Sequence, residues 1–286
     1  MKILVTGATG FVGKHVVNEL LKYDYTIVAT TNKTKENKSY DKLSYAFLDL
    51  DNINPDKDYF SHLGNPDMLI HLAWQGLPNY KSLFHFEKNL ISHYAFLKNI
   101  IKNGLKKLVV TGTCFEYGMK DGCLSEDMIT DPQNSYALAK DTLRKFLFEL
   151  KQTHEFDCKW VRLFYIYGEG QNPKALLSQL ENALQKGDKV FNMSGGEQLR
   201  DYLPIKKVAE YIVTIALQEH ISGIVNCCSG KPISVKELVE NYLKDTNREI
   251  ELNAGYYPYT DYEAMAFWGD DTKLKQIINE RSNSGI

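Results

Sequence analysis

The chain has 286 residues, of which 43% are hydrophobic, and its formal net charge is −2. A slightly acidic chain with scattered lysines offers no basic surface for a nucleic acid. No apolar run reaches the roughly 20 residues that a membrane-spanning helix needs, so no membrane contact is expected. The five cysteines form no CxxC pair. We therefore expect no disulfide framework, no metal site, and a cytoplasmic location in which the thiols stay reduced.

Short apolar runs alternate with amphipathic helical patterns through the first two-thirds of the chain. Helical patterns cover Val12–Tyr23, Phe84–Asn103 and Tyr136–Thr153. Such alternation is typical of an α/β protein with a Rossmann-type, doubly wound parallel sheet of about seven strands. Strands are predicted at Met1–Thr6, Thr26–Thr30, Tyr45–Leu48, Met68–Ala73, Leu108–Thr111 and Trp160–Phe164.

The pattern changes after Tyr165. Glycines interrupt the helices between Gly168 and Gly196, and four residues at Tyr256–Tyr259 include three tyrosines. We expect a smaller, discontinuous α/β lobe that binds the substrate over the open end of the sheet. The predicted dinucleotide-binding domain comprises residues 1–164 and about 203–228, and the substrate lobe comprises about 165–202 and 229–286.

A glycine-rich turn follows the first predicted strand, with glycines at Gly7, Gly10 and Gly13. Glycines at these places allow a tight turn, a close backbone approach to a pyrophosphate, and close packing of helix on strand. The helix that begins there offers free amide donors to the phosphates. The spacing is GxxGxxG rather than GxGxxG, and at the first strand–helix junction of such a fold it predicts dinucleotide binding.

The end of the second strand indicates the type of dinucleotide. NAD sites usually place an acidic residue there, about 20 residues past the glycines, to bind the ribose 2′-hydroxyl. Here the sequence reads Ala29-Thr30-Thr31-Asn32-Lys33, without an acid. Hydroxyls and one lysine suit a 2′-phosphate. The sequence therefore favours NADP(H), and NAD(H) stays open.

A tyrosine and a lysine, Tyr136 and Lys140, are four residues apart in the predicted helix. They share one helix face. An ammonium nearby favours the phenolate, so we expect a lowered pKa of Tyr136 and a role as proton donor or acceptor. Thr113 follows the strand that ends near Thr111, where parallel sheets present ligands, and is expected to bind the substrate oxygen.

Together, the glycine turn, Thr113, Tyr136 and Lys140 resemble the extended short-chain dehydrogenase/reductase family, in its nucleotide-sugar epimerase, dehydratase and reductase branch. The resemblance runs over nearly the whole chain. The segment Gln198–Tyr202 resembles the family's RDY segment, whose arginine grips the substrate's diphosphate, a task that suits a guanidinium. The segment Arg162–Gly168 resembles RxxNxYG, except that Tyr165 replaces the asparagine.

The resemblance implies further site residues. His71–Trp74 resembles the HLAA strand end beside the cofactor, Asp49 and Leu50 match the pair that flanks adenine, and Asn89 matches an asparagine that supports the active-site helix. The predicted cofactor residues are Gly7, Thr9, Gly10, Phe11, Val12, Gly13, Thr31, Asn32, Lys33, Asp49, Leu50, Leu72, Ala73, Trp74, Asn89, Thr111, Tyr136 and Lys140. The predicted substrate residues are Trp74, Thr113, Cys114, Phe115, Tyr165 and Arg200. The family also implies a homodimer, formed through the helices at Phe84–Asn103 and Tyr136–Thr153.

Two neighbours of Thr113 bear on the reaction. Cys114 could act as an acid/base in C3 or C5 epimerisation, but family members with that chemistry carry the cysteine one residue away, and small buried cysteines are usually inert. The 4,6-dehydratases of the family carry Asp-Glu directly after the threonine, where this chain has Cys114 and Phe115, which argues against a dehydratase. Glu116 is displaced by one residue and is expected to point elsewhere.

Three functions fit these residues. The favoured one is an NADPH-dependent reductase of a nucleotide-diphosphate-linked 4-keto-6-deoxy sugar, with the proton from Tyr136, because reductive enzymes often use NADPH. A nucleotide-sugar C4 epimerase or 4-dehydrogenase would use the same residues. A non-catalytic NADP-sensing protein is the third, and the presence of both Tyr136 and Lys140 argues against it. By resemblance, products of such enzymes feed surface polysaccharides.

Overall fold

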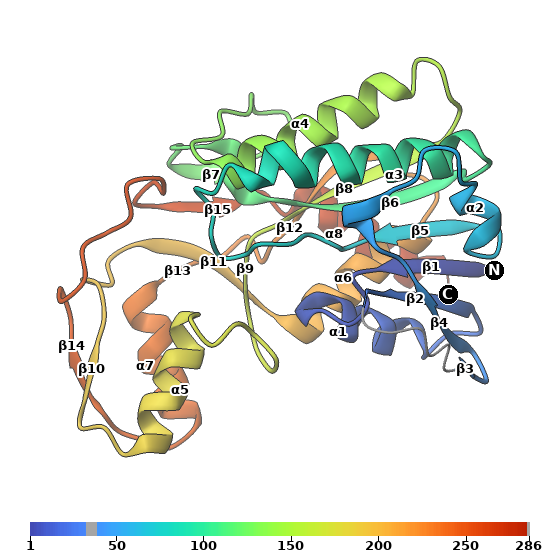
Figure 1. The fold of residues 1–286 in the computed structure, drawn as a ribbon. Helices are drawn as coiled ribbons and strands as arrows, with labels where there is room; N and C mark the ends of the chain where they lie inside the picture. Colours follow the sequence, from blue (N-terminus) through green and yellow to red (C-terminus); the bar gives the residue numbers. More distant parts are fainter. Residues whose placement is uncertain (33–38, 285–286) are drawn as a thin grey trace.

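The computed structural model describes residues 1–32 and 39–284, and its centre is a sheet of eight strands in the order β12-β8-β6-β5-β1-β2-β4-β3 (Figure 1). Neighbouring strands are parallel, except that β3 runs antiparallel to β4. The strands are β1 (Lys2–Thr6), β2 (Thr26–Thr31), β3 (Ser39–Tyr40), β4 (Leu43–Phe47), β5 (Met68–His71), β6 (Lys107–Thr113), β8 (Asp157–Leu163) and β12 (Gly223–Cys227).

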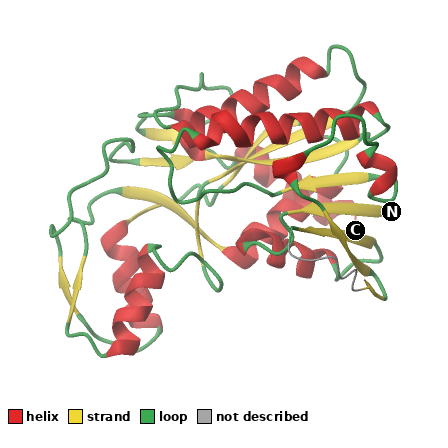
Figure 2. Cartoon of the chain, in the orientation of Figure 1, coloured by secondary structure: helices red, strands yellow, loops and turns green. Residues whose placement is uncertain are grey.

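Side chains alternate between the two faces of this sheet, and each face is covered by helices (Figure 2). In β1, Ile3 and Val5 belong to one buried apolar cluster and Leu4 to the other. The first cluster includes residues of α1 (Phe11–Leu20), α6 (Ile205–Leu217) and α8 (Thr272–Ser284). The second includes residues of α2 (Tyr59–His62), α3 (Leu90–Lys102) and α4 (Ser135–Leu150). Burial on both faces explains the continuous apolar runs, and the arrangement confirms the predicted doubly wound fold.

A second group of elements lies beside the sheet, around α5 (Leu176–Lys186) and α7 (Val235–Asp245) (Figure 1). These two helices share an apolar cluster of their own, which includes Leu180, Phe191 and Val239. The predicted domain boundaries stay a prediction. The small sheets pair β10 (Val190–Asn192) with β14 (Glu251–Asn253), β7 (Gly122–Leu124) with β15 (Phe267–Gly269), and β11 (Leu199–Pro204) with both β9 (Tyr165–Tyr167) and β13 (Pro232–Ser234).

Several element ends differ from the prediction. Helix α1 ends at Leu20 rather than Tyr23, and the helix predicted from Phe84 opens with a π-helical turn, η2 (His85–Asn89), before α3. Strand β6 continues to Thr113 and therefore carries this residue itself. Two short 3₁₀ turns, η1 (Leu50–Asn52) and η3 (Cys114–Tyr117), follow β4 and β6.

Candidate active site

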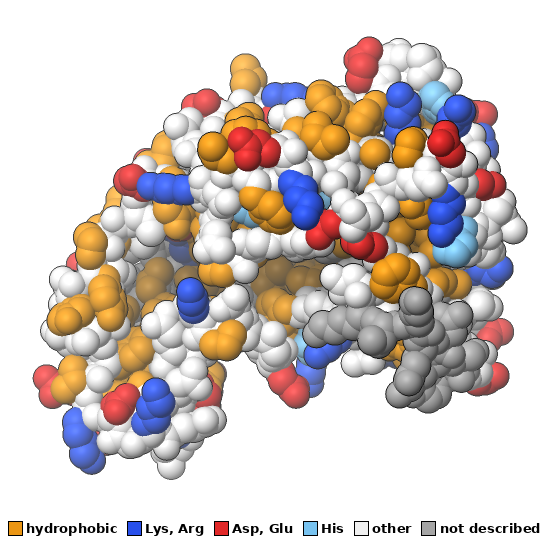
Figure 3. Space-filling view, viewed as in Figure 1, with side chains coloured by type: hydrophobic (Ala, Val, Ile, Leu, Met, Phe, Trp, Pro, Cys, Tyr) orange, Lys and Arg blue, Asp and Glu red, His pale blue; other side chains and the backbone are white. Residues whose placement is uncertain are grey.

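A cleft of about 700 Å³ opens at the carboxyl ends of the parallel strands. Residues that follow β1, β5, β6 and β8 line it, and the segment before α5 closes the opposite side. The space-filling view shows a hollow with hydrophobic atoms on its floor between the two groups of elements (Figure 3). This is where doubly wound sheets bind their ligands, and the volume suits a large organic molecule.

The glycine turn forms one end of the cleft and fits a dinucleotide. Gly7 has a φ of +68°, and a Cβ added there would lie 2.7 Å from the Ala73 nitrogen. A Cβ on Gly13 would overlap the Gly7 carbonyl oxygen. Helix α1 begins after Gly10, whose position carries no side-chain cap, so its first amides are left to a ligand. The predicted residues Thr9, Phe11 and Val12 line the cleft here as well.

The side of the cleft at the end of β2 is lined by Thr30, Thr31 and Asn32, and Leu50 faces it. The predicted Lys33 lies outside the described residues. Within the part of the chain that the structure describes, no Asp or Glu lines the cleft. Asp49 does not line the cleft. Its carboxylate instead caps η1 by accepting from the Asp51 nitrogen at 2.9 Å.

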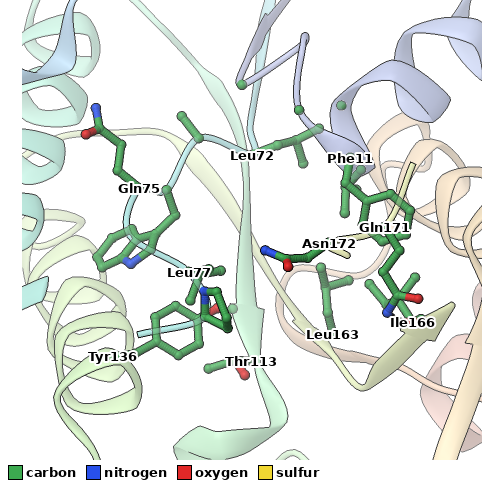
Figure 4. A pocket seen from close by; sticks show the side chains of 18 of the residues that line it. Phe11, Leu72, Gln75, Leu77, Thr113, Tyr136, Leu163, Ile166, Gln171 and Asn172 are labelled. Carbon is green, nitrogen blue, oxygen red and sulfur yellow. Dashed lines mark hydrogen bonds between the residues drawn. The ribbon is translucent and has the colours of Figure 1, made fainter. Parts of the chain in front are cut away.

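Strand β6 and helix α4 bring Thr113 and Tyr136 together on the cleft wall (Figure 4). The Thr113 side chain lies close enough to the phenol to lower the pKa of Tyr136. The start of α4 is fixed by Asn134, whose side chain accepts from the Ala137 nitrogen at 2.9 Å. The Tyr136 nitrogen donates to the Tyr80 carbonyl at 2.9 Å, which ties α4 to the loop after β5.

The pKa of Tyr136 differs from the sequence-based expectation. Burial raises this pKa above its ordinary value, and the Tyr80 phenol and the Glu116 carboxylate raise it further, whereas the Thr113 side chain lowers it. The expected lowering by Lys140 is therefore not the outcome in this structure. Desolvation of the phenolate outweighs the favourable interactions, so the protonated phenol is the stable form.

The Lys140 ammonium is buried against two indole rings. Its Nζ lies 4.4 Å from the ring centre of Trp74, which lines the cleft, and 5.3 Å from that of Trp160. Burial lowers the pKa of Lys140 to about 7, and the Glu116 carboxylate opposes this shift. This ammonium of α4, held between two aromatic faces, is therefore close to its titration point at neutral pH.

This pKa predicts how stability depends on pH. Between about 7 and 10.5 the unfolded chain binds more protons at Lys140 than the folded chain does, so the free energy of unfolding rises with pH in this window. The rise is about 1.4 kcal/mol per pH unit and is absent in Lys140→Met. Urea unfolding gives the free energy of unfolding of wild type and of Lys140→Met at each pH. The wild-type value minus the variant value should be about 2 kcal/mol larger at pH about 9.5 than at pH about 8. Lys186→Met at the exposed end of α5 is the control, and parallel pH profiles for wild type and Lys140→Met would contradict the shift.

Asn89, Thr111 and His71 lie behind the cleft, where their hydrogen bonds hold the segments that line it. Asn89 donates to the Gln75 carbonyl at 3.0 Å and is buried. The Thr111 hydroxyl lies 3.5 Å from the His71 carbonyl and is buried as well. The His71 ring bonds Thr6 on one side and His93 on the other, each at 2.7 Å. These contacts fix the strand ends and the loop that carries Leu72, Ala73 and Trp74 into the cleft.

Aromatic rings surround the end of the cleft beside Tyr136. The Tyr80 ring lies 5.3 Å from Phe115, 5.6 Å from Tyr136 and 6.1 Å from Tyr262, measured between ring centres. Cys114 also lines the cleft, and burial raises the pKa of its thiol, which disfavours the thiolate that an acid/base role requires.

Arg200 is placed differently from the sequence-based expectation. It does not line the cleft and is 1% exposed. Its guanidinium pairs with the Glu263 carboxylate at 3.1 Å, donates to the Tyr165 hydroxyl at 3.2 Å and to the Leu199 carbonyl at 2.8 Å. Tyr165 itself reaches the cleft. A paired, enclosed guanidinium is not presented to a diphosphate in this structure.

The segment before α5 supplies cleft residues that the sequence reasoning did not identify. Gln171, Asn172 and Lys174 line the cleft opposite the strand ends. Among the residues that the structure describes, Lys174 is the only charged side chain that lines it. The glycines at Gly168 and Gly170 marked an irregular segment here, but nothing in their spacing indicates that it turns back onto the cleft.

Over the described ranges 1–32 and 39–284, no cluster of three or more His, Cys, Asp or Glu side chains could hold a metal ion. No helix in those ranges combines the length and the apolar character needed to cross a membrane.

Comparison with known proteins agrees with this fold. A family model described as "NAD dependent epimerase/dehydratase family" matches residues 3–228. The dTDP-6-deoxy-L-talose 4-dehydrogenase (NAD(+)) of Aggregatibacter actinomycetemcomitans is 32% identical over 273 residues, which cover 94% of this chain and 99% of that protein. YtcB of Bacillus subtilis (strain 168), named an uncharacterized UDP-glucose epimerase, is 27% identical over 98% of this chain and 92% of its own. The solved structure "MoeE5 in complex with UDP-glucose and NAD" has a TM-score of 0.82 and 25% identity, and the match covers 98% of this chain and 92% of that one.

The chain belongs to the NAD dependent epimerase/dehydratase family. This confirms the predicted extended short-chain dehydrogenase/reductase family and its nucleotide-sugar branch. The protein is thus an enzyme of a family that acts on nucleotide sugars with a nicotinamide cofactor.

Proposed function

We propose that the protein is a C4 oxidoreductase of a nucleotide-linked 6-deoxy sugar, which interconverts the sugar's 4-hydroxyl and 4-keto forms. The observation that carries the proposal is the meeting of the Thr113 hydroxyl and the Tyr136 phenol on the cleft wall. The relative from Aggregatibacter, named a 4-dehydrogenase, supports this reaction. A 4-dehydrogenase and a 4-keto reductase are two directions of one reaction, so the reductase favoured from the sequence and this alternative share one mechanism.

In this mechanism the protein moves one proton and fixes one oxygen. Tyr136 takes the proton of the 4-hydroxyl in oxidation and returns it in reduction, and its protonated resting form suits the reductive direction. Thr113 holds the same sugar oxygen through its hydroxyl. The Lys140 ammonium stabilises negative charge that develops on Tyr136. The dinucleotide, when held by the turn at Gly7–Gly13, supplies the nicotinamide that accepts or donates the hydride.

For the cofactor we propose NADP(H) in preference to NAD(H). The absence of a carboxylate from the described lining of the cleft supports room for a 2′-phosphate, which an acidic residue would repel. The names of the Aggregatibacter relative and of the MoeE5 complex contain NAD instead, so the two cofactors must be compared directly.

The composition of the cleft supports the sugar class. Leu77, Pro78 and Phe115 line it, and a C6 methyl group fits such a wall better than a carboxylate does. We place the substrate's diphosphate beside Lys174, since the described lining offers no second cation. Arg200 acts in this proposal through Tyr165 and Glu263, by shaping the wall.

A homodimer through α3 and α4 also belongs to this proposal. The exposed apolar side chains Ile91, Leu138 and Phe146 lie on these two helices, and the rings of Phe146 and Tyr94 pack 5.1 Å apart. Adjacent exposed apolar residues on paired helices suit an interface with a second copy. A cytoplasmic location and a role in surface polysaccharide synthesis stay predictions.

The function is tested by mixing purified protein with NADPH or NADH and a panel of nucleotide-linked 4-keto-6-deoxy sugars, and by following the absorbance of the reduced nicotinamide. We expect stoichiometric loss of the reduced-nicotinamide absorbance with at least one sugar, at a higher kcat/KM for NADPH. A C4 epimerase would instead give sugar isomers without net consumption, and the name of YtcB, a UDP-glucose epimerase, supports testing for this class. Neither consumption nor isomers with any sugar would contradict both functions.

A further inference from the structure

Glu116 is a carboxylate with 0% exposure that lies in η3, directly behind Thr113. It does not line the cleft, as expected from its displacement along the sequence. A buried charge is destabilising unless it is paired and hydrogen-bonded, so the contacts of this carboxylate indicate what it is for.

One set of contacts fixes the backbone around Thr113. The Glu116 Oε1 accepts from the Thr113 nitrogen at 2.9 Å, and the Thr113 hydroxyl accepts from the Phe115 nitrogen at 3.3 Å. Together they close a capping box over the end of β6. A Cβ on Gly112 would overlap the same Oε1. The carboxylate therefore packs directly against the peptide that carries the Thr113 side chain to the cleft.

A second set of contacts reaches the surroundings of Lys140. The Trp160 indole nitrogen donates to both carboxylate oxygens of Glu116, at 3.0 and 3.1 Å, and the Trp160 ring is one of the two that flank the ammonium. Arg162 donates from Nε to Oε2 at 2.8 Å and balances the charge. One carboxylate thus connects the Thr113 turn, the neighbouring strand β8 and the wall beside Lys140.

We propose that Glu116 is a positioning residue for this active site, which holds the Thr113 hydroxyl in its working place without touching the substrate. The inference rests on the proposed function, because it assigns the effect of Glu116 to the role of Thr113. Small displacements of a group that aligns the reacting oxygen lower the rate of the chemical step more than they weaken binding.

The test is a double-mutant cycle of Glu116→Gln and Thr113→Val. We expect Glu116→Gln to lower kcat on the order of 10²-fold with the sugar KM nearly unchanged. We expect the double variant to be no slower than Thr113→Val alone, because the position of a missing hydroxyl no longer matters. Glu126→Gln is the matched control. The main-chain carbonyl of Glu126 accepts from Arg162 Nη1 at 3.5 Å, whereas its half-buried carboxylate accepts from the Asn226 nitrogen at 2.8 Å and does not contact Thr113, so kcat should not change.

Each outcome decides the inference. Wild-type kcat in Glu116→Gln, or effects of the two substitutions that simply multiply, would show a structural role only and overturn it. A Thr113→Val variant with full activity would instead overturn the proposed function, so the two failures are distinguishable. Folding is checked by thermal melting. If Glu116→Gln does not fold, Glu116→Gln/Arg162→Gln, which removes the unpaired guanidinium, takes its place in the same cycle.

Discussion

Substitution of Tyr136 by phenylalanine should strongly reduce turnover and leave cofactor binding intact. In the proposed function the phenol exchanges a proton with the sugar oxygen, and the phenylalanine ring of the variant fills the same space on the cleft wall. Loss of a general acid/base lowers kcat by about 10²- to 10⁴-fold. Steady-state kinetics and a fluorescence titration with the cofactor measure the two quantities.

The matched control for Tyr136 is Tyr117→Phe. This second buried phenol belongs to η3, but it donates to Asn226 at 2.7 Å and does not line the cleft. Its loss should reduce stability by about 1 kcal/mol and leave kcat unchanged. Near-normal turnover in Tyr136→Phe would remove the proposed proton donor and leave the reaction without an acid on this wall.

Substitution of Gly13 by alanine should weaken cofactor binding by more than about 100-fold, which corresponds to roughly 3 kcal/mol. The added methyl group overlaps the Gly7 carbonyl and lies 2.8 Å from the Ala8 Cα, both of which are backbone atoms that cannot rotate away. The turn must open, and the amide N–H groups at the start of α1 then no longer point together at the pyrophosphate. Calorimetric titration of the cofactor measures this loss, with thermal melting to confirm the fold.

Gly187→Ala is the control for the turn. Gly187 ends α5 with a φ of +75° and has no atom within 4 Å of an added Cβ. Its substitution strains one residue and should lower stability by about 1 kcal/mol without any change in cofactor affinity. Unchanged affinity in Gly13→Ala would contradict the assignment of this turn to the pyrophosphate.

The parts of the site that the sequence predicted are those whose geometry is local. Glycines three residues apart after a strand define a turn, and Tyr136 and Lys140 share a helix face because of the α-helical period. Thr113 could be placed because a parallel sheet brings its carboxyl ends to one edge. The alternation of buried runs with helical patterns predicted the fold for the same reason, since each face of a doubly wound sheet needs its own helices.

The parts that the sequence did not predict depend on partners far apart in the chain. Arg200 meets Glu263 only after the last segment folds back beside β11, so its burial has no local signal. Nor does spacing predict that Lys140 lies between indoles, or that burial decides the pKa of Tyr136. Lys33, on which the predicted preference for NADP(H) partly rests, lies outside the described residues.

The position of Lys140 has an optical consequence. Two of the chain's three tryptophans, Trp74 and Trp160, have their rings within 5.3 Å of its ammonium. Indole emission responds to a nearby charge, and one of these rings also faces the cleft. We therefore expect the intrinsic tryptophan fluorescence to change when Lys140 is protonated and when a ligand enters the cleft, so that both events can be followed without a label.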